Sequence, residues 1–395
     1  MKFFVWAALA ALAILTTTRD AAAYPWMIRH GYGACAACHA DPSGAGLLTV
    51  YGRAQSELLL STRYRAPAEE EEPSSFQRAF FGLLPLPSNV LIGGWVRNGY
   101  LWNTRGGNLV DNRFLQMRAD LGAQVTLGRF RASGTIGFAR AESAPFAQQA
   151  WVTTSKDGPN LVSREHWLGF DAVEDKVLVR AGRINLPFGL RNLEHTSWVR
   201  AETRTDYNQG QSHGAAVSYT GESFRGEAMA IAGNYQQNPD RYRERGLSAF
   251  GEVAFGSHAA FGVSTLFVHA DADIGARKEV FRQAHGVHGR LSFWKPLVLL
   301  AEGDALVSSL KTVGTKIGWV GFFQQDFEII QGVHGMFTLE ALRRPTEGAK
   351  PGFGAWLSAA WFFLPHFDIR GDIIRRSGLD APATTSYLAQ LHGYL

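Results

Sequence analysis

Both cysteines of the 395-residue chain stand in one short motif, Cys35-Ala36-Ala37-Cys38-His39. The C-x-x-C-H spacing is that of a c-type haem attachment site. Two thiols add to the two vinyl groups of one haem, and the adjacent histidine binds the iron from the proximal side. We therefore predict one covalent haem c, held by Cys35 and Cys38, with His39 as an iron ligand.

Two other uses of a C-x-x-C pair are a redox disulfide and half of a zinc site. A redox pair is expected near a βαβ pattern, and the sequence shows none. A structural zinc site needs four ligands, and there is no second C-x-x-C. For the sixth iron position, His30 and Met27 are both of residue types that serve as axial ligands. His30 is preferred; the alternative is that His30 is an ordinary polar residue and the ligand comes from elsewhere or is absent.

Residues 1–23 are typical of a Sec-type signal peptide. Lys2 gives a positive start, an apolar run follows, and a small-residue cleavage site precedes Tyr24. A membrane anchor is the alternative, but the apolar run is too short for a comfortable span. Export agrees with the motif, because c-type haem is attached outside the cytoplasm.

The net charge argues against nucleic acid as a partner. The whole chain carries +4, and removal of 1–23 takes away two basic residues and one acidic residue, which leaves +3.

The mature N-terminal segment, 24–66, is too small to surround a haem by itself. A segment of about 40 residues is near the limit below which a chain needs help to fold. We predict a short helix over 47–60, and its apolar face is formed by Leu47, Val50, Tyr51, Ala54 and Leu58. A charged, proline-bounded linker, 67–88, then leads to the rest of the chain.

From residue 89 to residue 395, apolar and polar residues alternate with the period of two that is typical of strands. No later run approaches the length of a membrane helix, yet 46% of the chain is apolar. We predict an all-β transmembrane barrel of about 16 antiparallel strands. The expected strands are 89–102, 111–127, 129–140, 163–172, 176–184, 213–221, 223–235, 245–256, 258–270, 282–293, 296–307, 313–323, 327–342, 352–363, 366–376 and 384–395.

The connections alternate between short turns and long loops, which is the layout of a bacterial outer-membrane barrel. A soluble sandwich or propeller also alternates, but it need not sort its connections by length. The connection 185–211 is the longest, and it either folds inward as in trimeric porins or lies on the surface with solvated charges.

Sixteen strands suit a water-accessible lumen. The polar residues expected to line it are Arg118, Asp120, Glu252, His288, Arg290, Glu302, Asp304, Arg370 and Asp372. The aromatic residues expected near the strand ends, where girdles form, are Trp294, Trp356, Trp361 and Phe362.

A haem motif just after a signal peptide, followed by a linker and a porin-sized barrel, resembles the fused monohaem cytochrome–porins. These include the outer-membrane iron-oxidising cytochromes of iron-oxidising bacteria. The resemblance rests on Cys35, Cys38, His39 and the architecture. It implies a haem segment in, or against, the periplasmic mouth of the barrel. Ferrous iron as electron donor rests on analogy alone, since no stretch specifies an iron site.

The leading hypothesis is an outer-membrane electron carrier rather than a bond-making enzyme; iron oxidase activity is only an analogy. Its expected partners are outer-membrane lipid, a periplasmic cytochrome or similar protein, an extracellular donor or acceptor, and further copies of the chain in a homo-oligomer. The alternative is a solute-diffusion porin whose haem segment is a plug or gate. A weaker hypothesis is a barrel whose haem peptide binds a periplasmic partner.

Overall fold

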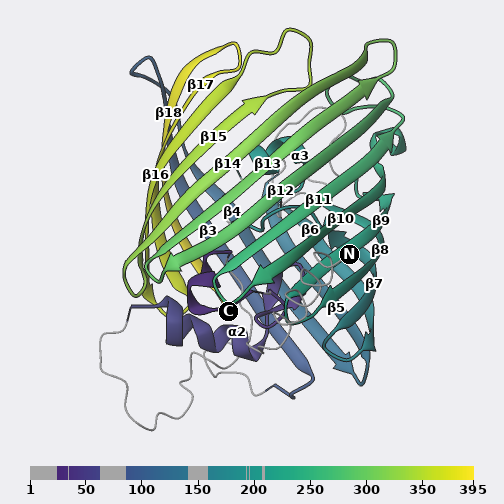
Figure 1. The fold of residues 1–395 in the computed structure, drawn as a ribbon, viewed down its shortest axis with the longest axis vertical. Coiled ribbons are helices and arrows are strands. Elements are labelled where there is room, and N and C mark those ends of the chain that lie inside the picture. Colours follow the sequence, from purple (N-terminus) through teal and green to yellow (C-terminus); the bar gives the residue numbers. More distant parts are fainter. Residues whose placement is uncertain are drawn as a thin grey trace, which may run out of the picture.

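The computed structural model describes residues 25–33, 35–62, 86–140, 159–192, 194, 196–206 and 210–395. The expected signal peptide and most of the expected linker lie outside the described residues. Within these ranges, a short N-terminal segment is followed by sixteen antiparallel strands that close into one barrel (Figure 1). No helix in this part of the chain is long and apolar enough to cross a membrane.

Each barrel strand pairs with its neighbours in sequence, and the last strand pairs with the first. Tyr394 of β18 stands opposite Trp95 of β3, and this pairing closes the barrel. The predicted fold class is therefore confirmed for the barrel. The strands are β3 Val90–Arg105, β4 Asn108–Leu127, β5 Phe130–Arg140, β6 Pro159–Val173, β7 Val177–Asn185, β8 Gln211–Thr220, β9 Phe224–Gly233, β10 Arg245–Phe255, β11 Ala259–Ala270, β12 Val280–Trp294, β13 Leu297–Leu310, β14 Gly314–Ile330, β15 Val333–Arg343, β16 Gly352–Leu364, β17 Phe367–Gly378 and β18 Ala381–Tyr394.

The outer face of the barrel is apolar, as the alternation predicts. Leu121, Val125 and Leu127 of β4 are exposed, and so are Ile369 and Ile373 of β17. On a closed barrel, exposed apolar side chains at every second position form a surface suited to lipid.

The short and long connections gather at opposite ends of the barrel. The ends are called here the short-turn end, with connections such as 174–176 and 221–223, and the long-loop end, with 186–210. The long gaps that the predicted strands leave at 103–110 and 377–383 are wrong, because the strands extend into them and 106–107 and 379–380 are tight turns.

One predicted turn is also wrong. The sequence places a turn at Gln325-Asp326, but β14 continues to Ile330 and the chain turns at 331–332. The side chains of Gln324 and Asp326 point inward and are buried in the lumen. Polar residues on the inner face of a long strand therefore resemble a turn in the sequence.

The N-terminal segment contains several short elements: η1 Pro25–His30, β1 His39–Asp41, β2 Ala45–Leu48, α2 Val50–Gln55 and η2 Ser56–Leu60. β1 pairs with β2 in a small antiparallel sheet of its own. The helix predicted over 47–60 therefore begins later than expected, since Leu47 and Leu48 belong to a strand.

The predicted apolar face of this helix is also wrong. Val50, Tyr51 and Leu58 are exposed, whereas Arg53 and Ser56 are buried against the barrel. The Ser56 hydroxyl lies 2.9 Å from the Tyr394 hydroxyl. The wall offers polar partners at this point, so the polar side of the helix faces it. This contact places the junction of α2 and η2 beside the C-terminal end of β18 (Figure 1).

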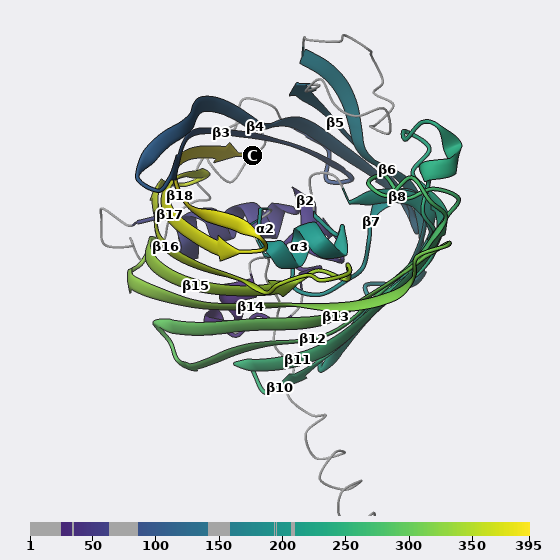
Figure 2. The ribbon, with the colours of Figure 1, turned by 90° about the horizontal axis from the view of Figure 1, so that it is seen from above.

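Much of the lumen is filled by side chains over the described residues. Seen from above, β2, α2 and the short helix α3 (Trp198–Thr203) lie within the ring of strands (Figure 2). One buried cluster joins side chains of the N-terminal segment, of the connection 186–210 and of the inner wall. The expected water-accessible lumen is therefore confirmed only in part: this cluster fills much of the interior, and a cavity of about 740 Å³ stays open at the short-turn end. The members of this buried cluster include Trp26, Met27, Ile28, Cys38, Leu186, Phe188, Leu190, Trp198, Val199, Leu266, Val298, Leu300, Val320 and Phe322.

The aromatic girdle is only partly confirmed. Trp294 and Trp361 are exposed near strand ends, as predicted. Trp356 and Phe362 are buried instead and line a cavity of the lumen. They extend the packed interior.

Candidate functional site

The C-x-x-C-H motif folds into one helical turn. The backbone N–H groups of Cys38 and His39 both donate to the carbonyl oxygen of Cys35, at 3.2 and 3.0 Å. Both thiols are buried, and no disulfide joins them. This turn, the Cys turn, therefore brings two thiols and one imidazole together, and that donor set fits covalent attachment of a haem.

The imidazole of His39 is oriented by the loop that follows it. Its Nδ1 atom lies 3.3 Å from the backbone carbonyl oxygen of Gly46. Because a carbonyl only accepts, this hydrogen bond puts the ring proton on Nδ1 and leaves the lone pair on Nε2. Desolvation lowers the pKa of His39 to about 4, so the ring is neutral near pH 7. A neutral imidazole with an available Nε2 is the form that binds iron.

Two glycines pack directly against the Cys turn. A Cβ atom added to Gly44, whose φ is +91°, would lie 2.6 Å from both Cβ and Sγ of Cys35. A Cβ added to Gly52 would lie 2.3 Å from the carbonyl oxygen of Cys38. The turn after the motif and helix α2 thus approach as closely as backbone allows. The Thr49 hydroxyl, which caps α2, also donates to the carbonyl oxygen of Ala37 at 2.8 Å.

An ion-pair chain fixes the segment just after the Cys turn to the wall. Asp41 Oδ1 lies 2.8 Å from Nη1 of Arg180, and Nη2 of the same arginine lies 2.6 Å from Glu227. All three side chains are buried. Burial by itself raises the pKa of Asp41, but the positive charges of Arg180 and Arg191 outweigh it and hold the pKa below its usual value.

A second ion pair fixes the segment before the Cys turn. Arg29 of η1 donates to Asp326 of β14, and both side chains are buried. The same carboxylate lies 3.0 Å from Nδ1 of His334, whose ring lies 4.6 Å from the ring of Trp26. The Cys turn is therefore held to the barrel from both sides.

The polar side chains predicted to line the lumen do face inward, but most are buried in ion pairs instead of lining water. Arg118 pairs with Asp120, and Arg290 pairs with Glu252. The others follow the same pattern or are buried, namely His288, Glu302, Asp304, Arg370 and Asp372.

The longest connection folds into the lumen, which confirms the inward alternative. Its helix α3 contacts β13, β14 and β15. Arg200 of α3 forms a buried ion pair with Glu302, and the backbone N–H of Trp198 donates to Glu340 at 2.6 Å. At the long-loop end, Arg204 lies 2.6 Å from Glu244 and 2.7 Å from Asp273. The loop is therefore fixed to the wall through charged contacts.

Two cavities lie beside these contacts. One of about 740 Å³ at the short-turn end is lined by Ala36, Ala37, Asp175, Arg225 and Glu252, among others. This volume is within the roughly 300–1,000 Å³ of small-molecule and cofactor sites.

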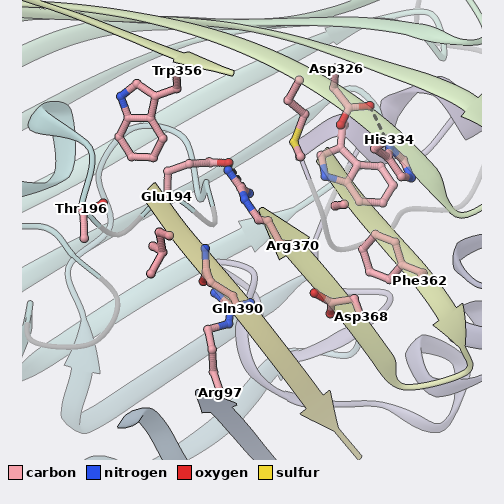
Figure 3. Close-up of a pocket in the computed structure, with 14 residues that line it drawn as sticks. Arg97, Glu194, Thr196, Asp326, His334, Trp356, Phe362, Asp368, Arg370 and Gln390 are labelled. Carbon is pink, nitrogen blue, oxygen red and sulfur yellow. Dashed lines mark hydrogen bonds and ion pairs between the residues drawn. The ribbon is translucent and has the colours of Figure 1, made fainter. Parts of the chain in front are cut away.

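The second cavity is smaller and lies between the longest connection and the strands β14 to β18. Its volume is about 30 Å³, which is room for about two water molecules. In Figure 3 the Arg370 side chain points toward Glu194, and their ion pair measures 2.7 Å. This cavity is too small to form an open pore.

Both candidates for the sixth iron ligand lie on η1. Met27 is fully buried in the same cluster as Cys38. His30 Nε2 lies 4.0 Å from Glu328 and, within the described residues, makes no hydrogen bond. Burial lowers the pKa of His30 to about 4, so its ring is neutral. The assignment of either residue to iron stays a prediction. Across the described residues, no group of three or more histidine, cysteine, aspartate or glutamate side chains is arranged to hold a metal ion.

No protein-family model matches the chain, and no curated protein matches it either. Solved outer-membrane proteins share its fold. Outer-membrane expressed OmpT of Vibrio cholerae superposes with a TM-score of 0.61 at 10% identity, over 79% of this chain and 99% of that one. An anion-selective porin from Comamonas acidovorans gives 0.57 at 10% identity, over 78% and 99%. The outer-membrane channel DcaP of Acinetobacter baumannii gives 0.51 at 12% identity, over 78% and 97%.

Proposed function

We propose that the chain is an outer-membrane electron carrier with one covalent c-type haem in the short-turn half of its barrel. The observation that supports this proposal is the Cys turn, whose two buried thiols lie between the rest of the N-terminal segment and the barrel wall. Cys35 and Cys38 would hold the haem, and His39 would bind the iron through Nε2. A bound haem would supply one-electron transfer, and it does no bond chemistry without a substrate pocket. The chain is accordingly proposed as a carrier and not as a bond-making enzyme.

The packed lumen supports this role. The N-terminal segment fills the short-turn half and the longest connection fills the other half, and one buried cluster joins them. Such an interior buries both thiols, and the space beside the Cys turn is the cavity of about 740 Å³ at the short-turn end. Nearby charge and solvent access are among the features by which proteins tune a haem potential.

The proposed location is the bacterial outer membrane, with the short-turn end in the periplasm. Lipid would cover the apolar outer face, and the layout of short turns and long loops sets the orientation. The cavity of about 740 Å³ at the short-turn end gives a periplasmic redox partner an approach to Ala36 and Ala37. An extracellular donor or acceptor, with ferrous iron as one candidate by analogy, would act at the other end. Because one solved neighbour is described as a trimer form, a homo-oligomer is part of the proposal.

A second candidate function is solute diffusion, with the haem segment as plug or gate. The observation that favours it is the likeness to solved proteins described as an anion-selective porin and as an outer-membrane channel. These neighbours share the fold at no more than 12% identity, so they carry the architecture only.

One experiment separates the two candidates. The protein is purified from outer membranes, stained for haem on a denaturing gel, and placed in liposomes for a swelling assay with a small sugar. The electron carrier predicts a stained band at the barrel's mass and swelling no faster than in empty liposomes. Fast swelling by protein without covalent haem would overturn it in favour of the porin.

A further inference from the structure

The barrel wall itself contacts the Cys turn through a trio of charged residues, of which Arg225 is partly buried and Glu252 and Arg290 are buried. Nη1 of Arg225, on β9, donates to Sγ of Cys35 at 3.1 Å. The same guanidinium donates through Nε to Glu252, on β10, at 2.8 Å. These residues and the cysteine come from segments far apart in sequence, so the fold alone brings them together.

Glu252 joins Arg225 to a second arginine. Arg290, on β12, donates through Nε to Glu252 at 3.2 Å and through Nη2 to the carbonyl oxygen of Gly33 at 2.6 Å. Glu252 and Arg290 are almost fully buried. The trio Arg225–Glu252–Arg290 thus contacts the N-terminal segment at two points, Gly33 just before the motif and Cys35 at its first residue.

The trio has a net positive charge, because two guanidinium groups face one carboxylate. Arginine stays protonated in proteins, so this charge does not depend on pH. Arg225 and Glu252 also line the cavity beside Ala36 and Ala37. A positive charge near an iron centre favours the reduced form, which carries one positive charge fewer, and water exclusion strengthens the effect.

We infer that Arg225 is a positioning residue for the haem site: it fixes Cys35 for attachment and, with Arg290, raises the midpoint potential of the attached haem. This inference rests on the proposed function and assigns part of the haem site to the barrel wall. Lysine would keep the charge but, with a single ammonium group, would not reproduce the planar fork that reaches both Cys35 and Glu252.

The test compares Arg225→Gln with Arg225→Lys, and uses Arg245→Gln as the matched control. Arg245 is on the same barrel at the long-loop end, where it pairs with Asp240. Each variant is purified from outer membranes, its folding is checked by its heat-dependent migration on gels, and two quantities are measured. These are covalent haem per barrel and the midpoint potential of the haem.

Arg225→Gln is expected to lower both the haem content and the midpoint potential. Arg225→Lys should restore the potential but not the full haem content, and Arg245→Gln should match the wild type in both. Should Arg225→Gln fail to fold, Glu252→Gln supplies the second test, because loss of that carboxylate should shift the potential upward. If folded Arg225→Gln kept the wild-type haem content and potential, or if Glu252→Gln left the potential unchanged, the inference about Arg225 would be overturned. The proposed function would then still stand. A wild type without covalent haem would overturn the proposed function as well.

Discussion

Nδ1 of His39 lies 3.3 Å from the carbonyl oxygen of Gly46, so the loop after the motif orients the imidazole that follows Cys38. Backbone hydrogen bonds of this kind fix the tautomer and the ring orientation of metal-binding histidines. The chemistry of the site is therefore set by its own turn and by the loop that returns to it.

Loss of this imidazole should change the coordination of the iron and leave the covalent link between haem and protein intact. We expect His39→Ala to keep haem on a denaturing gel, because both thiols remain, but to alter the absorption spectrum of the reduced protein. Cys38→Ser should lose stable attachment. His258→Ala, at an exposed turn of the short-turn end, is the control and should keep the wild-type spectrum. An unaltered reduced spectrum in His39→Ala would show that His39 is not the ligand.

Gly44→Ala should disturb the site through packing alone. The new methyl group would lie 2.6 Å from Cβ and Sγ of Cys35, and the residue already has a positive φ. We expect a cost of about 1–3 kcal/mol in stability and a lower haem content. Gly106→Ala is the matched control, since Gly106 also has a positive φ but has no atom within 4 Å of an added Cβ. Equal haem content in the two variants would contradict the packing argument.

The buried pair between Arg29 and Asp326 should matter far more than an exposed one. Asp326→Ala leaves the guanidinium of Arg29 buried with a weaker partner, Glu328 at 3.4 Å, and we expect a loss of about 3 kcal/mol. The control is Asp240→Ala, an exposed carboxylate that pairs with Arg243 and Arg245; it should cost less than about 1 kcal/mol. Denaturant unfolding in detergent, followed by tryptophan fluorescence, measures both. Equal losses would mean that Arg29 does not anchor the segment.

Acid should weaken the ion pairs through which Glu244 joins Arg204 of the longest connection to Arg282 of β12. Burial by itself raises the pKa of Glu244, but Arg282 and Arg204 outweigh it and lower the pKa to about 2, from a usual value of 4.5. A depressed pKa in the folded state stabilises the protein above pH 4.5, and this stability is lost as the pH falls toward 2. We expect a contribution of about 3 kcal/mol near pH 7. Glu244→Gln should therefore lose stability near pH 7 and show a flatter decline between pH 4.5 and 2; an unchanged slope in unfolding experiments would refute this.

The barrel could be predicted from sequence because each strand carries its own pattern. Leu121, Val125 and Leu127 alternate with polar residues and face outward as expected. The packing of the lumen was missed, although a signal exists in β13. There, Leu297-Val298-Leu299-Leu300 is apolar on both faces, which is typical of a strand buried on both sides.

The candidate site could be predicted only in part. The spacing of Cys35, Cys38 and His39 carries the chemistry, so the motif identifies them. Its surroundings depend on contacts between distant segments: Arg225 and Cys35 are 190 residues apart in sequence. The close approach of Gly44 depends on the path of the loop. Neither relation leaves a local pattern in the sequence.

The proposed haem site is tested most directly by a redox-titrated absorption spectrum of the protein purified from outer membranes, combined with thiol labelling of the denatured chain. We expect about one covalent haem per barrel, a reversible one-electron transition, no maleimide labelling of Cys35 or Cys38, and loss of the spectrum in the Cys35→Ser and Cys38→Ser variants. A folded barrel with no haem band and with both thiols labelled would contradict it.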